Sequence, residues 1–192
     1  SVGTRLALGT EKDHLNLVGY VDADYAGNVE NSKSRAGYVY MCCGAPIIWR
    51  SALQPVVAQS SCESEYISAN ACAREAEWCR LIYDELLLGN VDENGVVLGR
   101  SKEPVLLRED NQGCMALAKN FMITRRSKHI RVRFHYLRQQ VRDSLIRFEY
   151  INTKVNTADL FTKVLPKLLF NRHRDTMVKQ PHHWDPTAEL IE

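Results

Sequence analysis

The spacing of apolar residues changes near residue 60 of this chain, and that change limits the folds open to it. Before residue 60, apolar and polar residues alternate, which is the pattern of half-buried strands. After it, apolar residues recur at the spacing of an amphipathic helix. The alternating part predicts three strands, over Leu15–Asp22, Gly37–Cys42 and Ile47–Arg50. Short polar or glycine-containing turns connect them, so we expect an antiparallel meander.

The rest of the chain interleaves helices with short apolar strands. A long helix is predicted to begin at Ser60 or Ser61, either of which can cap it, and to end near Leu88. The later elements are predicted as a strand over 105–108, helices over 112–120 and 127–141, a strand over 145–151 and a short helix from 156 to before 166. Strands separated by helices require crossover connections. The fold class predicted is therefore α/β, a mixed five-stranded sheet flanked by helices.

The size of the chain fits one domain. With 192 residues, 45% of them hydrophobic, it can bury a core without disulfides. We expect the domain at 15–165, a leader from a preceding region at 1–14 and a C-terminal tail at 166–192. The first residue is not Met, which favours a piece of a longer protein. No apolar run is long enough for a membrane span, and the six cysteines lack metal-binding spacing, so we expect an intracellular chain without a membrane partner.

Charge is distributed unevenly although the net charge is only +2. Residues 1–99 carry 7 basic and 13 acidic side chains, whereas residues 100–179 carry 18 and 7. Most of the excess lies in 119–147, where nine Lys or Arg face a single acid, Asp143. Such a block is typical of a surface that binds a polyanion, although a merely solvated basic face has the same composition.

Two aspartates stand where predicted strands end. Asp22 ends the first strand and Asp110 directly follows the fourth. If these strands are parallel neighbours, their carboxyl ends meet at one edge of the sheet, where sites of such folds collect. Either residue alone is equally well explained as a turn or helix-cap aspartate.

The long helix offers Glu63 and Glu65 as further acids. Glu65 shares its helical stripe only with small residues at 69, 72, 76 and 79, which let a helix lie close to a sheet. We therefore expect Glu65 to face the strands and Glu63 to lie near the cap, although both could be solvent-side acids that favour the helix dipole. Asp159 follows Asn156 at capping-box spacing, so its role could be structural.

Four carboxylates at one sheet edge would repel one another unless cations lie among them. Ligands that are all oxygen suit Mg²⁺ or Mn²⁺. Two such ions can stabilise the attacking and leaving oxygens of a phosphodiester, a chemistry that fits the basic block nearby.

Several segments together resemble one known family. They are residues 19–27, 34–39, 48–51, 54–67, 109–111, 127–130, 135–138 and 157–163, among them Gly19-Tyr20-Val21-Asp22-Ala23-Asp24, Ser61-Cys62-Glu63-Ser64-Glu65, Glu109-Asp110-Asn111 and Thr157-Ala158-Asp159-Leu160-Phe161-Thr162-Lys163. In this order they resemble the RNase H domain of copia-type LTR retrotransposon polyproteins.

The resemblance implies an RNase H-like fold and a ribonuclease H that cleaves the RNA strand of RNA–DNA hybrids during reverse transcription, with two Mg²⁺ or Mn²⁺ ions. By position it implies that Asp22, Glu65, Asp110 and Asp159 are the catalytic, metal-binding residues. It also implies a reverse transcriptase domain in the same polyprotein. The setting it implies is a cytoplasmic retroelement particle, or the nucleus.

Contacts to the hybrid are expected from two places. Polar side chains beside Asp110 could sense 2′-hydroxyls, and basic side chains could bind phosphates. These residues are Asn111, Gln112, Arg125, Arg126, Lys128, Arg131 and Arg133. We expect His129 and His135 to be buried and to hold the basic helix in place.

A non-catalytic nucleic-acid-binding module, decayed or co-opted from a retroelement, is the alternative function. A decayed copy would often lack one of the four acids, and all four are present. An integrase of the same fold is disfavoured because its glutamate would lie on a late helix instead of the first long one.

Overall fold

Five strands form one mixed sheet in the order β3-β2-β1-β4-β5. The computed structural model describes residues 17–42, 44–86, 104–119 and 131–178. The strands β1 (Leu17–Asp24), β2 (Arg35–Cys42) and β3 (Ala45–Leu53) pair antiparallel as a meander. The strands β4 (Val105–Glu109) and β5 (Ile146–Tyr150) continue the sheet from β1 in parallel. The predicted α/β class with a mixed five-stranded sheet is confirmed.

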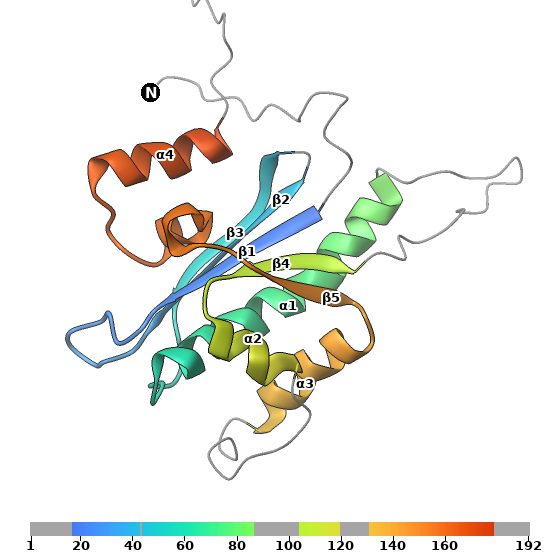
Figure 1. Cartoon of the computed structure of the whole chain (residues 1–192), viewed down its shortest axis with the longest axis horizontal. Coiled ribbons are helices and arrows are strands. Elements are labelled where there is room, and N and C mark those ends of the chain that lie inside the picture. The colour runs from blue at the N-terminus through green and yellow to red at the C-terminus, as the bar shows by residue number, and fades with distance from the viewer. Residues whose placement is uncertain (1–16, 43, 87–103, 120–130, 179–192) are drawn as a thin grey trace, which may run out of the picture.

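Helices cover both faces of this sheet (Figure 1). The helices α1 (Ser61–Leu86), α2 (Gln112–Lys119) and α3 (Arg131–Arg142) lie on one face. On the other face lie η3 (Thr157–Phe161), a 3₁₀ helix, and α4 (Lys167–Met177). A shorter 3₁₀ turn, η2 (Thr153–Val155), precedes η3. The short helix predicted from Asn156 is thus a 3₁₀ helix with a further 3₁₀ turn before it.

Two predictions about these elements were wrong in extent. The third strand was predicted only over 47–50, with a turn at 44–46, yet β3 includes Ala45 and Pro46. Because β3 is an edge strand and its pairing with β2 shifts register between Tyr40 and Met41, a proline can be accommodated there.

The segment predicted as a tail contains α4. The segment is amphipathic but short and rich in basic residues, and few of its side chains are buried: His173 is 1% exposed, whereas Leu168 is 86% exposed. The helix packs against η3. The expected leader at 1–14, the predicted strand residues Leu15 and Asn16 and the segment 179–192 lie outside the described residues.

Small residues bring α1 close to the sheet. The stripe that Glu65 shares is buried throughout, at Ala69, Cys72, Ala76 and Cys79. The Tyr40 hydroxyl on β2 donates a hydrogen bond of 2.8 Å to the Cys72 carbonyl, which also ties the helix backbone to the strand. The small side chains on this stripe let α1 lie near the sheet, so a carboxylate on the same stripe can reach the strands.

The other glutamate of the first turn belongs to the helix cap. The Ser60 hydroxyl accepts a hydrogen bond of 3.1 Å from the Glu63 backbone N–H. The Glu63 carboxylate in turn accepts one of 3.0 Å from the Gln59 backbone N–H. These two bonds resemble a capping box, except that the carboxylate binds the N–H of the residue before the cap. The Glu63 carboxylate therefore points to the backbone before α1.

Candidate metal centre

The centre of the sheet opens where β1 and β4 stop pairing. Their parallel register runs from Val18↔Leu106 to Tyr20↔Arg108. Asp22 and Asp110 each lie two residues beyond the last pair, so they stand level with each other on strands that are free to separate. Figure 1 shows the carboxyl end of β4 turning directly into α2 at this edge.

Three carboxylates meet in this opening. Asp22, Glu65 and Asp110 each contribute one carboxylate oxygen, and these oxygens all lie within 4.8 Å of one another. Asp22 is 1% exposed and Glu65 6% exposed, so water reaches two of the three carboxylates poorly. The side chains come from β1, from α1 and from the end of β4, and only the folded sheet brings them together.

Burial and mutual repulsion shape the chemistry of Glu65. Its Oε2 atom is buried and has no hydrogen-bond partner among the described residues. Burial raises the pKa of Glu65 to about 11, and the nearby carboxylates of Glu109 and Asp22 add to that shift. A buried oxygen without a donor is costly, and a cation or a proton would relieve that cost.

Sequence reasoning missed Glu109, a further acid at this site. It is 0% exposed, and one carboxylate oxygen accepts a hydrogen bond of 3.0 Å from the Asn111 backbone N–H. Burial raises its pKa well above the usual range, and repulsion from Asp110 and Asp22 contributes. The sequence did contain a sign of its burial. Every second residue of β4 is buried, and Glu109 is on the same face of the strand as Val105 and Leu107.

Asp159 reaches the site from η3 and is paired with a lysine. Lys163 Nζ lies 3.1 Å from Asp159 Oδ1 and 3.5 Å from Asp22 Oδ2. Burial raises the pKa of Asp159 to about 6, and Asp22 adds to that shift while Lys163 opposes it. The Thr162 hydroxyl donates a hydrogen bond to Asp22 Oδ2. Lys163 and Thr162 are two more site residues that sequence reasoning did not identify, although Lys163 follows Asp159 at helical i,i+4 spacing.

Two features hold η3 against the sheet. The Asn156 side chain caps η3 by accepting from the Ala158 backbone N–H at 3.2 Å and donates a hydrogen bond of 2.9 Å to the Val21 carbonyl on β1. Gly37 on β2 lies under η3: a Cβ there would come 2.6 Å from Thr162 Cγ2. The absence of a side chain at Gly37 therefore allows η3 to approach the strand that carries Asp22.

The residues expected to contact nucleic acid are only partly described. Asn111 Oδ1 accepts a hydrogen bond of 2.9 Å from the Cys114 backbone N–H, so Asn111 caps α2. Gln112 is exposed beside it. Arg131 and Arg133 belong to α3, but their side chains are outside the described part of the chain. The same holds for the whole of Arg125, Arg126, Lys128 and His129. The expectation that His135 is buried was wrong, because it is exposed on α3.

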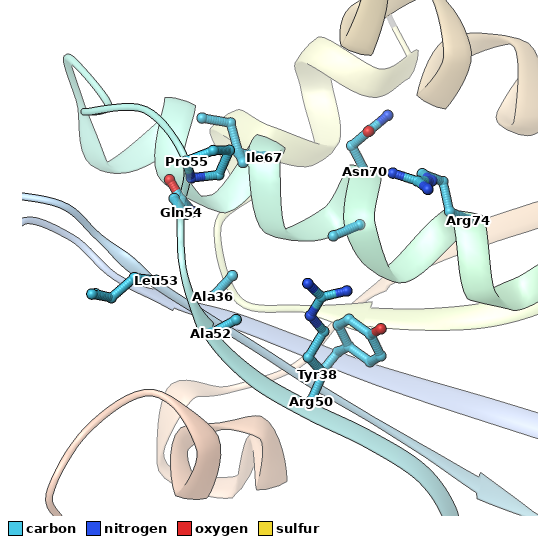
Figure 2. A pocket seen from close by; sticks show the side chains of 11 residues that line it. Ala36, Tyr38, Arg50, Ala52, Leu53, Gln54, Pro55, Ile67, Asn70 and Arg74 are labelled. Atoms are coloured by element: carbon cyan, nitrogen blue, oxygen red, sulfur yellow. The ribbon is translucent and has the colours of Figure 1, made fainter.

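A separate cavity lies between β3 and α1. It has a volume of about 170 Å³. Figure 2 shows Tyr38 and Arg50 on the sheet side and Asn70 and Arg74 on the helix side of it. No carboxylate is among the described residues that line it. This cavity therefore offers a divalent cation no charged ligand among its described lining residues, and the acidic group beside β1 and β4 remains the candidate metal centre.

The acidic group fits divalent ions of the magnesium type. All its donors are oxygens, they converge within a few ångströms, and the unpartnered Oε2 of Glu65 is the kind of atom that a hard cation satisfies. Asp22, Glu65 and Asp110 would hold one ion. Asp159 is not among the acids whose oxygens converge within 4.8 Å, and it is linked to Asp22 through Lys163.

The sheet order, the helices on both faces and the acids at the split between β1 and β4 define an RNase H-like fold. A solved RNase H1 isolated from compost by a metagenomic approach has this fold, with a TM-score of 0.51 over 77% of this chain and 93% of that one, at 16% identity.

Sequence relatives define the family more narrowly. The chain is 38% identical over 154 residues to the retrovirus-related Pol polyprotein from transposon TNT 1-94 of Nicotiana tabacum, and 33% identical over 156 residues to that from transposon RE2 of Arabidopsis thaliana. These matches cover 80% and 81% of the chain. The chain belongs to the Pol polyproteins of copia-type retrotransposons, and its described part has the RNase H-like fold. It spans only 11% and 10% of the length of these two relatives. No family model matches the chain.

Proposed function

We propose that this chain is a metal-dependent endoribonuclease that hydrolyses the RNA strand of RNA–DNA hybrids during retrotransposon reverse transcription. The observation that carries the proposal is the convergence of Asp22, Glu65 and Asp110 within 4.8 Å at the open edge of an RNase H-like sheet. Similarity to retrovirus-related Pol polyproteins supports it, because the family resemblance implies an RNase H domain next to a reverse transcriptase.

The chain's own residues supply binding and orientation. Asp22, Glu65 and Asp110 would hold one Mg²⁺ or Mn²⁺. Asp22 with Asp159, which now share Lys163, would hold a second. When bound, two such ions activate a water for attack and stabilise charge on the leaving oxygen. Thr162 fixes the orientation of Asp22, and Asn156 fixes the position of η3 and hence of Asp159. The buried Glu109 precedes Asp110, and its carboxyl accepts a hydrogen bond of 3.0 Å from the Asn111 backbone N–H, which holds the turn from β4 into α2.

The substrate would be positioned by residues around this edge. Gln112 is exposed next to Asp110, and Asn111 caps the helix that begins there. The arginines and lysine at 125, 126, 128, 131 and 133 would contact phosphates, which orient a hybrid without reading its sequence. The reverse transcriptase domain of the same polyprotein would be the neighbour that delivers the hybrid. No described helix has the length and apolar content that crossing a bilayer requires.

A cleavage assay tests the proposal. The chain, incubated with an RNA–DNA hybrid labelled on either strand, should cut the RNA strand in Mg²⁺ or Mn²⁺ and stop in EDTA. Asp22→Asn and Asp110→Asn should each abolish cleavage while the far-ultraviolet circular dichroism stays unchanged. Asp24→Asn is the matched control: it changes the same charge on the same strand, and Asp24 is outside the group that converges within 4.8 Å.

Two results would contradict the proposal. Cleavage that survives Asp22→Asn would show that the nuclease activity comes from elsewhere or from a contaminant. Hybrid binding without any cleavage in either metal would favour the non-catalytic module instead.

A further inference from the structure

Lys163 occupies a position between two acids that would bind a cation. Its ammonium lies 3.1 Å from Asp159 Oδ1 and 3.5 Å from Asp22 Oδ2. Both carboxylates are almost fully buried, with side chains 2% and 4% exposed, whereas the lysine side chain is 33% exposed. The lysine thus enters a buried acidic pair from the solvent side.

One of these acids belongs also to the three-carboxylate group. Asp22 contributes an oxygen to the cluster with Glu65 and Asp110 and accepts the Lys163 ion pair at Oδ2. A divalent ion bound at Asp22 would lie only a few ångströms from the ammonium. Two positive charges that close repel strongly in a site shielded from water.

We propose that Lys163 is a tethered counter-ion of the metal-free site, which neutralises Asp22 and Asp159 and must be displaced when ions bind. The inference rests on the proposed function, since it takes the acidic group to be a metal site. Lys163 is suited to displacement because it lies just past the last residue of η3, on a flexible four-carbon stem that already reaches solvent. In this role it is a positioning residue, which keeps the two acids in place while no metal is bound. It also lowers the affinity of the site for Mg²⁺, because the ion must displace the ammonium.

Mg²⁺ alone is the probe, so the test does not depend on cleavage. Isothermal titration calorimetry and thermal unfolding with added Mg²⁺ are compared for the wild-type chain, Lys163→Met and Lys163→Arg. Methionine keeps the stem and removes the charge, whereas arginine keeps the charge. Lys167→Met is the control, because Lys167 is exposed on α4 and pairs with no carboxylate among the described residues.

Lys163→Met should bind Mg²⁺ roughly tenfold more tightly than wild type, a size that one unit charge a few ångströms from the ligand oxygens accounts for. In EDTA the same variant should melt at a lower temperature, because Asp22 and Asp159 then repel without a counter-ion. Lys163→Arg and Lys167→Met should keep the wild-type Mg²⁺ affinity. A purely structural lysine would lower the melting temperature without tightening Mg²⁺ binding.

Several outcomes would overturn the inference. Equal or weaker Mg²⁺ binding by Lys163→Met, with wild type binding normally, would refute the counter-ion role and leave the metal site intact. Absence of Mg²⁺ binding in both chains would refute the metal site itself, and the inference with it. If Lys163→Met unfolds in EDTA, Lys163→Gln and refolding in the presence of Mg²⁺ supply the same comparison.

Discussion

Replacing Glu65 by glutamine should stabilise the metal-free chain, and the gain should grow with pH. Burial and the neighbouring acids raise the pKa of Glu65 to about 11 from an ordinary value of 4.5. Between these values the folded chain retains a proton that the unfolded chain has lost. The folded state is therefore penalised progressively as the pH rises, and glutamine, which never ionises, removes that penalty.

The size of the effect follows from proton linkage. Each pH unit inside this window costs the wild-type chain at most about 1.4 kcal/mol of unfolding free energy. The stability difference between Glu65→Gln and wild type should thus grow by up to about 2.7 kcal/mol between roughly pH 5.5 and pH 7.5. Glutamine is nearly isosteric with glutamate, so packing against the small-residue stripe is unchanged.

Urea unfolding in EDTA, followed by circular dichroism, measures this difference. Glu77→Gln is the matched control, because Glu77 is exposed on the same helix and should change stability by no more than about 0.5 kcal/mol at either pH. A difference between Glu65→Gln and wild type that is the same at both pH values would refute the reasoning, as would a variant less stable than wild type at the higher pH. Added Mg²⁺ should stabilise wild type more than Glu65→Gln, because the variant lacks one ligand.

Three further substitutions test how the site is held. Gly37→Ala should cost about 1–3 kcal/mol by overpacking against η3 and should reduce hybrid cleavage, as urea unfolding and the labelled-hybrid assay would show. Tyr40→Phe removes the hydrogen bond to Cys72 and should cost about 1 kcal/mol while cleavage is kept below the melting temperature. Asn156→Ala removes a cap and the bond to β1; a loss of about 1–2 kcal/mol together with most of the cleavage rate is expected, and full activity in that variant would remove Asn156 from the support of the site.

The pattern of the sequence was enough to predict the fold class and the inward glutamate. The alternation of apolar and polar residues predicted the meander. The change to helical spacing predicted α1, and the strands between later helices predicted the crossover connections. The preference for Glu65 over Glu63 followed from the small residues on one stripe, and the structure places Glu65 beside Asp22 and Glu63 in the helix cap. The catalytic roles of the four acids stay a prediction, as do the domain limits.

Other parts of the site depend on contacts between distant segments. Glu109 is adjacent to a predicted ligand, yet its burial becomes apparent only when α1 and α2 cover β4. Nothing in the sequence around Lys163 distinguishes it from a surface lysine. Its two partners, Asp22 on β1 and Asp159 on η3, become neighbours only in the folded chain. Helix α4 was missed although its sequence is amphipathic, because it follows Pro166, beyond the end of the predicted domain and within the expected tail.

The hydrogen bond between Thr162 and Asp22 joins positions 140 residues apart. Closing so long a loop is slow relative to forming hairpins or single helices, so this edge of the domain should be among the last parts to assemble. During synthesis from the N-terminus, the meander and α1 emerge well before η3 does. In a chain growing from its N-terminus, Asp159, Thr162 and Lys163 would therefore join Asp22 only after η3 has left the ribosome.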